Sequence, residues 1–286
     1  MSYDNRSNER RGGYDRRDGG RRGGNRDQRR GNDRRGGGDR RGGGKVRHDR
    51  SNPYRQGYRE DRMAQKENEP ALPDDIDVTD LDPSVLQDLR VLSKDNADRV
   101  AKHMIMAATW MADDPKLALT HARAAKNRAG RVGVVREAAG IAAYHAGEWK
   151  EALSELRAAR RMSGGPGLLA VMADAERGLG RPEKALEIGR GPEAKDLDDA
   201  SKIELAIVMA GARHDMGQHE SALATLQQLN PSMKGKDFED IRLSYAYADA
   251  FAQVGRNEEA RKWFEHVVKI DAEKMTDAAQ RLKELN

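Results

Sequence analysis

The chain has 286 residues, with 52 Lys and Arg against 48 Asp and Glu, a net charge of +4 and no cysteine. The lack of cysteine excludes disulfides, thiolate nucleophiles and cysteine-ligated zinc, and it fits a reducing compartment. No uninterrupted apolar run reaches the ~18 residues of a membrane-spanning helix, and the first residues do not begin a signal peptide, so we expect a cytoplasmic protein that does not bind membranes.

Residues 1–62 form a basic segment that is poor in aliphatic side chains. This segment contains 19 Arg and one Lys against ten acidic residues, so its net charge is +10, and residues 63–286 carry −6. Fourteen of the 29 glycines also lie here. Such a segment cannot bury enough apolar surface to offset chain entropy, so the sequence predicts a disordered tail.

Arginine doublets followed by glycines recur in this tail, with tyrosines between and after them. The residues concerned are Arg10, Arg11, Arg21, Arg22, Arg34, Arg35, Arg40 and Arg41, with Tyr14 between the first two doublets. The pattern resembles the RGG-box segments of RNA-binding proteins, which implies contact with RNA or ribosomes. The composition is also compatible with a solubilising segment, with self-association, and with folding back onto the acidic remainder of the chain.

Residues 63–81 are acidic and contain prolines, which predicts an extended linker. Asp82 followed by Pro83 then marks a helix start, because proline at the first helical position loses only an amide hydrogen that would be unpaired anyway. We expect a short helix from there to about Leu92. A second helix is expected to start near Asp95 and to carry Val100 and Met104 on its apolar face.

A spacing of about one helical hairpin recurs through the rest of the chain. Five times a small or turn-forming residue is followed five positions later by alanine: Asp113 and Ala118, Gly147 and Ala152, Gly180 and Ala185, Gly217 and Ala222, and Gly255 and Ala260. The steps are close to the ~34-residue period of helix-turn-helix repeats. No segment shows the alternating pattern of strands, so we expect an all-α fold.

The residues around these pairs resemble the tetratricopeptide repeat (TPR). The stretch from Gly133 to Pro166 matches the family at Gly140, Gly147, Trp149, Ala152, Leu156 and Ala159, and the last unit matches at Ala248, Phe251, Gly255, Ala260, Phe264 and Val267. The resemblance implies a TPR-like α-solenoid of about five helical hairpins over residues 82–286. A capping helix is expected at its C-terminal end, after Asp271 as N-cap, and a short second helix in the unit at Gly180.

The stretch from Ala138 to Gly164, and especially Ala143 to Trp149, is similar to a group of actinobacterial TPR proteins with an Arg/Gly/Asp-rich N-terminal tail. This similarity extends over roughly residues 80–270. It implies a fold and a type of cell, and no biochemical role.

The TPR resemblance also implies a groove for a partner, lined by the first helix of each unit. The family's contact positions correspond here to His103, Trp110, Glu137, Ile141, Tyr144, Asp174, Arg177, Ile207, His214, Tyr245 and Asp249. The lysine and asparagine set of chaperone-binding TPR domains is absent, so the implied ligand is an extended or helical peptide with basic and apolar side chains. Trp110 and Tyr144 are equally compatible with packing between repeats.

Enzymatic motifs are absent from the sequence. It contains no phosphate-binding P-loop, no nucleophile elbow and no zinc-binding His-Glu-x-x-His helix, so we expect neither an enzyme nor a cofactor. The sequence predicts an adaptor that binds a protein through the groove and carries a basic tail for RNA or ribosomes. Two alternatives remain at this point: an RNA-binding protein in which the tail is the main element, and a self-associating structural protein.

Overall fold

The computed structural model describes residues 57, 59–60, 63–64 and 68–285. Of the two compact units into which the chain divides, Met1–Asp49 lies outside this range and Arg50–Asn286 contains all the described helices. The predicted disorder of the tail, and the proposed nucleic-acid residues from Arg10 to Arg41, concern residues outside the described part.

The described residues form twelve α-helices and two short 3-10 helices, without a strand. The prediction of an all-α fold is therefore confirmed for this part of the chain. In chain order the elements are η1 (Val78–Asp80), α2 (Pro83–Leu89), α3 (Lys94–Thr109), α4 (Pro115–Ala129), α5 (Gly133–His145), α6 (Trp149–Ser163), α7 (Leu169–Gly178), α8 (Pro182–Gly189), η2 (Pro192–Asp196), α9 (Asp199–Asp215), α10 (His219–Gln227), α11 (Phe238–Gln253), α12 (Asn257–Ile270) and α13 (Ala278–Glu284).

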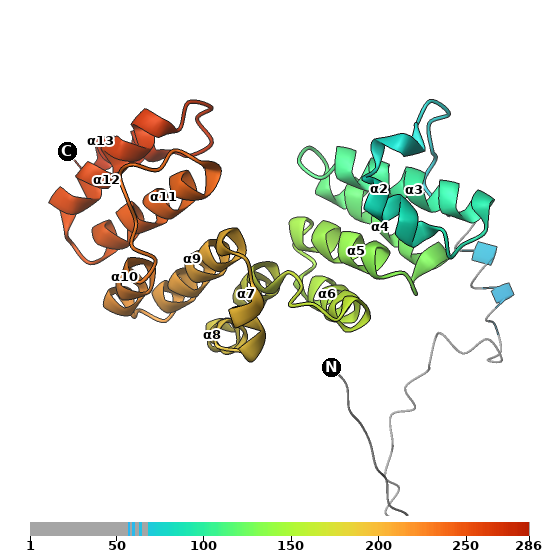
Figure 1. Cartoon of the computed structure of the whole chain (residues 1–286), viewed down its shortest axis with the longest axis horizontal. Coiled ribbons are helices and arrows are strands. Elements are labelled where there is room, and N and C mark those ends of the chain that lie inside the picture. Colours follow the sequence, from blue (N-terminus) through green and yellow to red (C-terminus); the bar gives the residue numbers. More distant parts are fainter. Residues whose placement is uncertain (1–56, 58, 61–62, 65–67, 286) are drawn as a thin grey trace, which may run out of the picture. The chain divides into compact units, whose positions relative to one another are not determined.

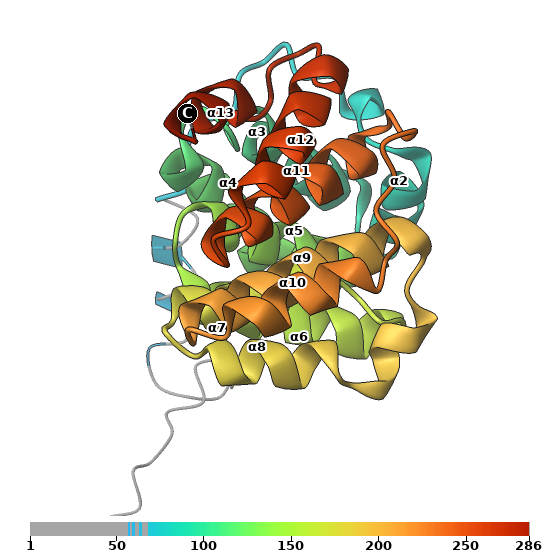
Figure 2. The same ribbon diagram turned by 90° about the vertical axis from the view of Figure 1, so that its left-hand side faces the viewer.

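Helices α3 to α12 pack as five consecutive pairs (Figures 1 and 2). Within each pair the two helices contact each other, and the second helix also contacts the first helix of the next pair. The first helices contact one another in chain order, α3 with α5, α5 with α7, α7 with α9 and α9 with α11. We call α3, α5, α7, α9 and α11 the first-helix row.

Small residues allow α5 and α6 to approach closely. Gly140 lies against Leu156, and a Cβ atom at Gly140 would come within 2.6 Å of the leucine Cγ. Ala139, Ala143 and Ala152 are completely buried beside them. This accounts for the glycine and alanine positions of the sequence pattern, since larger side chains would hold the two helices apart.

The turns within the last four pairs share one geometry. Three residues connect the two helices, and the middle one is Gly147, Gly180, Gly217 or Gly255, with φ between 69° and 78°. Side chains with a Cβ are disfavoured at such positive φ values, which explains the glycine at each step.

The connection between α3 and α4 is different. It has five residues, 110–114, and contains no glycine. Asp114 caps α4 by accepting a hydrogen bond from the amide of Leu117 at 2.9 Å, and Pro115 occupies the first helical position. Counted back from the start of the second helix, the first helix of this pair therefore ends two residues earlier than the first helices of the other pairs.

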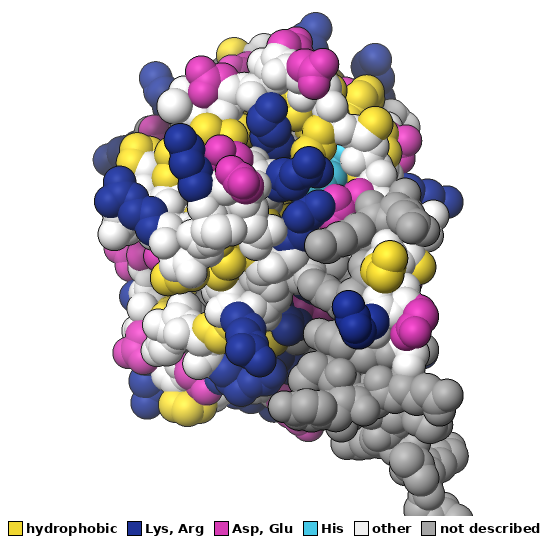
Figure 3. All heavy atoms as spheres, turned by 90° about the vertical axis from the view of Figure 1, so that its right-hand side faces the viewer, with side chains coloured by type: hydrophobic (Ala, Val, Ile, Leu, Met, Phe, Trp, Pro, Cys, Tyr) yellow, Lys and Arg dark blue, Asp and Glu magenta, His cyan; other side chains and the backbone are white. Residues whose placement is uncertain are grey.

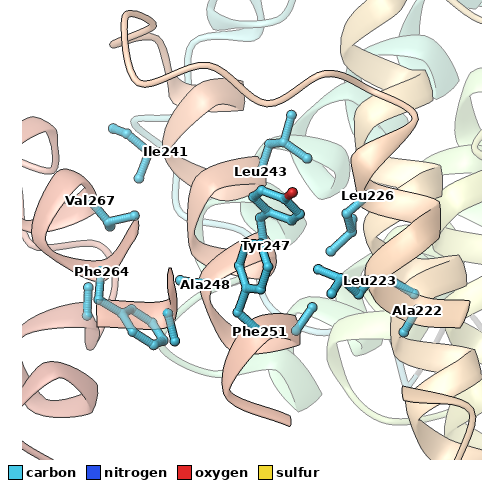
Figure 4. Close-up of a cluster of buried hydrophobic side chains, with 14 residues drawn as sticks. Ala222, Leu223, Leu226, Ile241, Leu243, Tyr247, Ala248, Phe251, Phe264 and Val267 are labelled. Atoms are coloured by element: carbon cyan, nitrogen blue, oxygen red, sulfur yellow. The ribbon is translucent and has the colours of Figure 1, made fainter. Parts of the chain in front are cut away.

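The largest buried cluster lies in the C-terminal part, among α10, α11 and α12 (Figure 4). Leu223 and Leu226 of α10 lie on one side of Tyr247 and Phe251 of α11. Phe264 of α12, which has no exposed surface, lies on the other side of α11. Burying an aromatic or aliphatic side chain of this size stabilises a fold by about 1.5–3 kcal/mol, so this cluster anchors the last two pairs.

Two local predictions are confirmed at helix ends. Asp82 accepts a hydrogen bond from the amide of Ser84 at 2.7 Å and Pro83 begins α2, although the helix ends at Leu89 and so is shorter than expected. The second helix after Gly180 is short, as predicted, because α8 ends at Gly189 and η2 follows at Pro192.

The predicted role of Asp271 as the N-cap of the last helix is wrong. Asp271 is the C-cap of α12, and α13 begins seven residues later, at Ala278. The Asp271 carboxylate accepts hydrogen bonds from the amides of Met275 and Thr276, at 2.9 and 2.8 Å. Asp271 therefore organises the turn between the two helices. Ser, Thr, Asn and Asp side chains accept backbone hydrogen bonds in turns as well as at helix N-caps.

Candidate partner-binding surface

Hydrogen bonds between side chains cross from one first helix to the next. The Tyr144 hydroxyl on α5 donates to Asp174 on α7, with 2.5 Å between Oη and Oδ2. Arg177, one turn further along α7, donates from Nε and Nη2 to Asp215 on α9, at 2.8 and 3.2 Å. Arg177 also donates to Asp174 at 2.7 Å, so these side chains form one connected network.

A separate link joins α9 to α11. Arg242 donates from Nε and Nη2 to the two carboxylate oxygens of Glu204 on α9, at 2.5 and 2.6 Å. Four successive first helices are thus joined by polar side chains. We call the six linking residues the first-helix strip: Tyr144, Asp174, Arg177, Glu204, Asp215 and Arg242.

Two glycines shape the middle of the strip. A Cβ atom at Gly211 would lie 2.6 Å from the guanidinium carbon of Arg177, and one at Gly178 would lie 2.6 Å from the indole of Trp149. Because glycine has no Cβ atom, the side chains of Arg177 and Trp149 can lie directly on the backbone of a helix. An open hollow of about 770 Å³ remains there, lined by Trp149, Asp174, Arg177, Gly178, Gly180, Pro182, Glu183, Asp215 and Met216.

Burial and hydrogen bonds shift the pKa values of two strip residues, Tyr144 and Arg177. The pKa of Tyr144 is raised by burial and by its hydrogen bond to Asp174, so the hydroxyl remains a donor at neutral pH. Burial alone would lower the pKa of Arg177, but the hydrogen bond and charge of Asp215 raise it above its usual value. At neutral pH Tyr144 therefore remains a neutral phenol and Arg177 a charged guanidinium.

The predicted groove residues Tyr245 and Asp249 are engaged with the C-terminal end of the chain. The Tyr245 hydroxyl donates to Asp277 at 2.5 Å, and Arg281 on α13 donates to Asp249 at 2.5 Å. These contacts hold α13 against the last first helix. The structure thus places these two residues beside α13.

Three further predicted residues lie on the first-helix row without joining the strip. Ile141 and Ile207 are partly exposed on α5 and α9. Glu137 is half-buried, which raises the pKa of its carboxyl group, and it forms no ion pair within the described residues. His214 on α9 instead contacts the second helix of the same pair, since its Nδ1 lies 2.8 Å from Nδ1 of His219 on α10.

Of the predicted groove residues on the first pair, the structure buries His103 and places Trp110 at the end of its helix. His103 is 1% exposed, and its Nδ1 lies 3.1 Å from Nδ1 of His121 on α4. Trp110 lies beyond the end of α3 as its C-cap. The longer connection to α4 explains both, because a shift of two residues rotates a position by about 200° around the helix axis.

The sequence pattern missed Glu204, Asp215 and Arg242. Both ion pairs that they form join residues 38 positions apart, which is close to the steps of 37 and 38 residues from Gly180 to Gly217 and from Gly217 to Gly255. Opposite charges one repeat apart on successive first helices were the signal available in the sequence. Charge complementarity across helices becomes informative only when the helices are known to lie side by side.

The described residues contain no group of three or more His, Asp or Glu side chains that could hold a metal ion. None of the helices in this range is both long enough and apolar enough to cross a membrane. No protein-family model matches the chain, and comparison with curated proteins finds no match.

Proposed function

We propose that this protein is a non-enzymatic adaptor, with a TPR-like α-solenoid that binds a segment of another protein along its first-helix row. The observation that carries the proposal is the first-helix strip, whose polar contacts join each of α5, α7, α9 and α11 to the next. A continuous face made by successive helices is the surface that repeat proteins use for extended ligands. The basic segment 1–62 is proposed to add a contact to RNA.

Side chains of the strip remain accessible to a ligand. Arg242 is 44% exposed, Asp215 39% and Glu204 30%, so each reaches solvent while it keeps its neighbour. Exposed ion pairs contribute only about 0–1 kcal/mol to stability, so these side chains can exchange one partner for another at little cost. They are therefore suited to recognition.

The chemistry of the surface defines the ligand. Carboxylates of Asp174, Glu204 and Asp215 accept from Arg or Lys side chains, and Ile141 and Ile207 offer apolar contact area. A segment with basic and apolar side chains, extended or helical, fits this combination.

Charge reversal on the strip tests the proposal. The variant with Glu204→Lys and Asp215→Lys is compared with a control that carries Glu220→Lys and Glu265→Lys on the exposed faces of α10 and α12. Each variant is used to capture proteins from the source cells, and its fold is checked by circular dichroism. We expect the strip variant to lose partners that the control retains.

A charge-swap variant tests whether partial unfolding, and not the changed charges, causes the loss of partners. Glu204→Arg with Arg242→Glu keeps an ion pair between α9 and α11 and reverses its direction. The swapped protein is expected to melt near the wild-type temperature and still lose partners. An unchanged set of partners in both strip variants would refute binding through the first-helix row.

A further inference from the structure

The segment preceding α2 is attached to α3 and α4 by a buried carboxylate. Oε2 of Glu69 lies 2.5 Å from Nη2 of Arg128 on α4 and 4.0 Å from Nε2 of His103 on α3. The side chains of Glu69 and Arg128 are only 12% and 13% exposed. A segment predicted to be an extended spacer thus makes a specific contact with the first helix pair.

The guanidinium group is held in place for this contact. Nη1 of Arg128 donates to Asn96 at 3.4 Å, and the Asn96 amide donates back to the Arg128 carbonyl at 3.5 Å. Nε of Arg128 is buried and has no hydrogen-bond partner among the described residues. An oriented guanidinium with a spare donor matches the two oxygens of a carboxylate.

The two buried histidines complete the pocket. Burial, followed by the proximity of His121, lowers the pKa of His103 to about 4, so His103 is neutral at pH 7. If His121 donates across the 3.1 Å Nδ1–Nδ1 contact, the single proton of His103 is on Nε2, which is the nitrogen nearest Glu69. Among the described residues that line the pocket's interior, Arg128 then supplies the full positive charge.

The rim carries charges of both signs. A hollow of about 730 Å³ borders the pocket and is lined by Glu69, Pro70, Ala71, Leu72, Pro73, Asp74, Asp95, Asp98, Arg99, Lys102 and His103. Figure 3 views the side on which α3 and α4 lie in Figure 1, and Lys and Arg side chains gather on it. An acidic ligand therefore meets attractive charges, Arg99 and Lys102, and repulsive ones, Asp74, Asp95 and Asp98, on its way to Arg128.

Glu69 is the main polar attachment of its segment. Within the described part of the chain, no backbone hydrogen bond joins residues 69–74 to a helix. Ala71, Pro73 and Asp74 are exposed, and only Pro70 and Leu72 are partly buried. Replacing a single carboxylate should therefore release residues 69–74.

We propose that Asn96, His103 and Arg128 form a carboxylate-binding pocket, which Glu69 fills from the same chain and which an acidic side chain of a peptide ligand fills in its place. The site is separate from the first-helix strip and binds groups of the opposite charge. While Glu69 occupies it, this residue is held against α3 and α4. The tether gives Glu69 an effective concentration of about 1 mM or more, so a competing ligand must be abundant or make additional contacts.

The first test is chemical rescue of the full chain. Glu69→Ala removes one methylene and the carboxylate, which together correspond to acetate. We expect the melting temperature to fall by about 2–6 °C and acetate to restore at least half of the loss. Acetamide, or chloride at the same ionic strength, should restore none of it.

Asp74→Ala is the matched control, because Asp74 belongs to the same segment and is exposed. This variant should melt like the wild type and should not respond to acetate. A second variant that lacks both Glu69 and Arg128 should also fail to respond. An equal response to acetate in all variants, or none in Glu69→Ala, overturns the pocket.

The second test follows the segment itself. Because the chain has no cysteine, Ala71→Cys gives a single site for a spin label. The label should be restrained in the wild-type background and mobile when Glu69→Gln is added. Millimolar acetyl-Asn-Glu-Pro-Ala-Leu-amide should mobilise the label in the wild-type background, and the same peptide with Gln in place of Glu should not. Equal mobility with and without the carboxylate, or equal effects of the two peptides, contradicts the proposal.

Discussion

The helix pairs α3/α4 and α5/α6 share an architecture and differ in the turn that connects their two helices. Their second helices begin 34 residues apart, at Pro115 and Trp149, but five residues connect the first pair and three connect the second. Asp114 and Pro115 close the first turn, and Gly147 with φ +76° closes the other. A constant spacing between second helices therefore does not fix the rotation of the first helices.

The interiors of the two pairs differ as well. α3/α4 buries His103 against His121, whereas α5/α6 buries Gly140 under Leu156. One pair holds a buried polar contact and the other a close contact between small and aliphatic residues. The stability of the first pair should therefore depend on pH, and the stability of the second pair on the volume of the substituted side chain.

The largest effect is expected from Gly140→Val. The added side chain would meet Leu156 at less than 3 Å, so we expect a loss of more than about 3 kcal/mol, measured by urea unfolding. The volume argument also predicts non-additivity. Leu156→Ala should destabilise the wild type but recover part of the stability of Gly140→Ala. Additive effects would show that the close contact is not the cause.

The pair α3/α4 should lose stability in acid. The pKa of His103 is about 4 in the folded chain and about 6.5 when exposed, so the unfolded chain binds the proton more tightly. Stability from this group is complete above pH 6.5 and is lost as the pH falls to 4, by up to about 3 kcal/mol.

The measurement is the free energy of unfolding across this pH range for the wild type and for His103→Gln. The exposed His145→Gln on α5 serves as the control. Carboxylates titrate in all three proteins, so the difference between the curves isolates His103. Parallel curves for the wild type and His103→Gln would contradict the prediction.

Substitutions in the turns of the two pairs should show a smaller difference in stability. Gly147→Ala forces a side chain to adopt φ +76°, which should cost about 1–2 kcal/mol. Asp113→Ala, at the position that the sequence spacing equates with Gly147, should change stability by less than about 0.5 kcal/mol, because its backbone has no positive φ. Thermal melts of both variants compare the two turns directly. Equal losses would mean that the two turns are alike.

The smallest effect is expected where the two pairs meet. Arg123 on α4 donates to Glu151 on α6 at 2.6 Å, and its side chain is 45% exposed. Arg123→Ala should therefore cost about 0.5 kcal/mol, and the cost should shrink in 1 M salt. Urea unfolding at low and high salt measures it. A loss that salt leaves unchanged would indicate packing of the arginine stem instead.

Local signals were sufficient to predict many helix boundaries. Asp82-Pro83 marked the start of α2, and Gly189 and Pro192 marked the early end of α8. Each of these residues acts on its own backbone, through capping, a missing amide hydrogen or a missing side chain. Asp271 misled the prediction because an aspartate that accepts backbone hydrogen bonds can serve a turn as well as a helix start.

The candidate site was predictable only in part. Tyr144, Asp174 and Arg177 were identified from repeat positions, and the structure joins them in one network. His103, at a predicted contact position, is buried, because the two extra residues before α4 change the rotation of α3. Glu69 was assigned to a spacer, because nothing in its own sequence neighbourhood indicates Arg128, 59 residues away.

The sequence by itself determined the helices, their turns and the positions at which they approach closely, since these depend on capping, φ preferences and side-chain volume within a few residues. Only the tertiary structure decided which charged and aromatic groups meet. Those contacts join residues 30 to 59 positions apart, and they depend on how each helix is rotated against its neighbours. Two added residues in one turn are enough to exchange the buried and exposed faces of a helix.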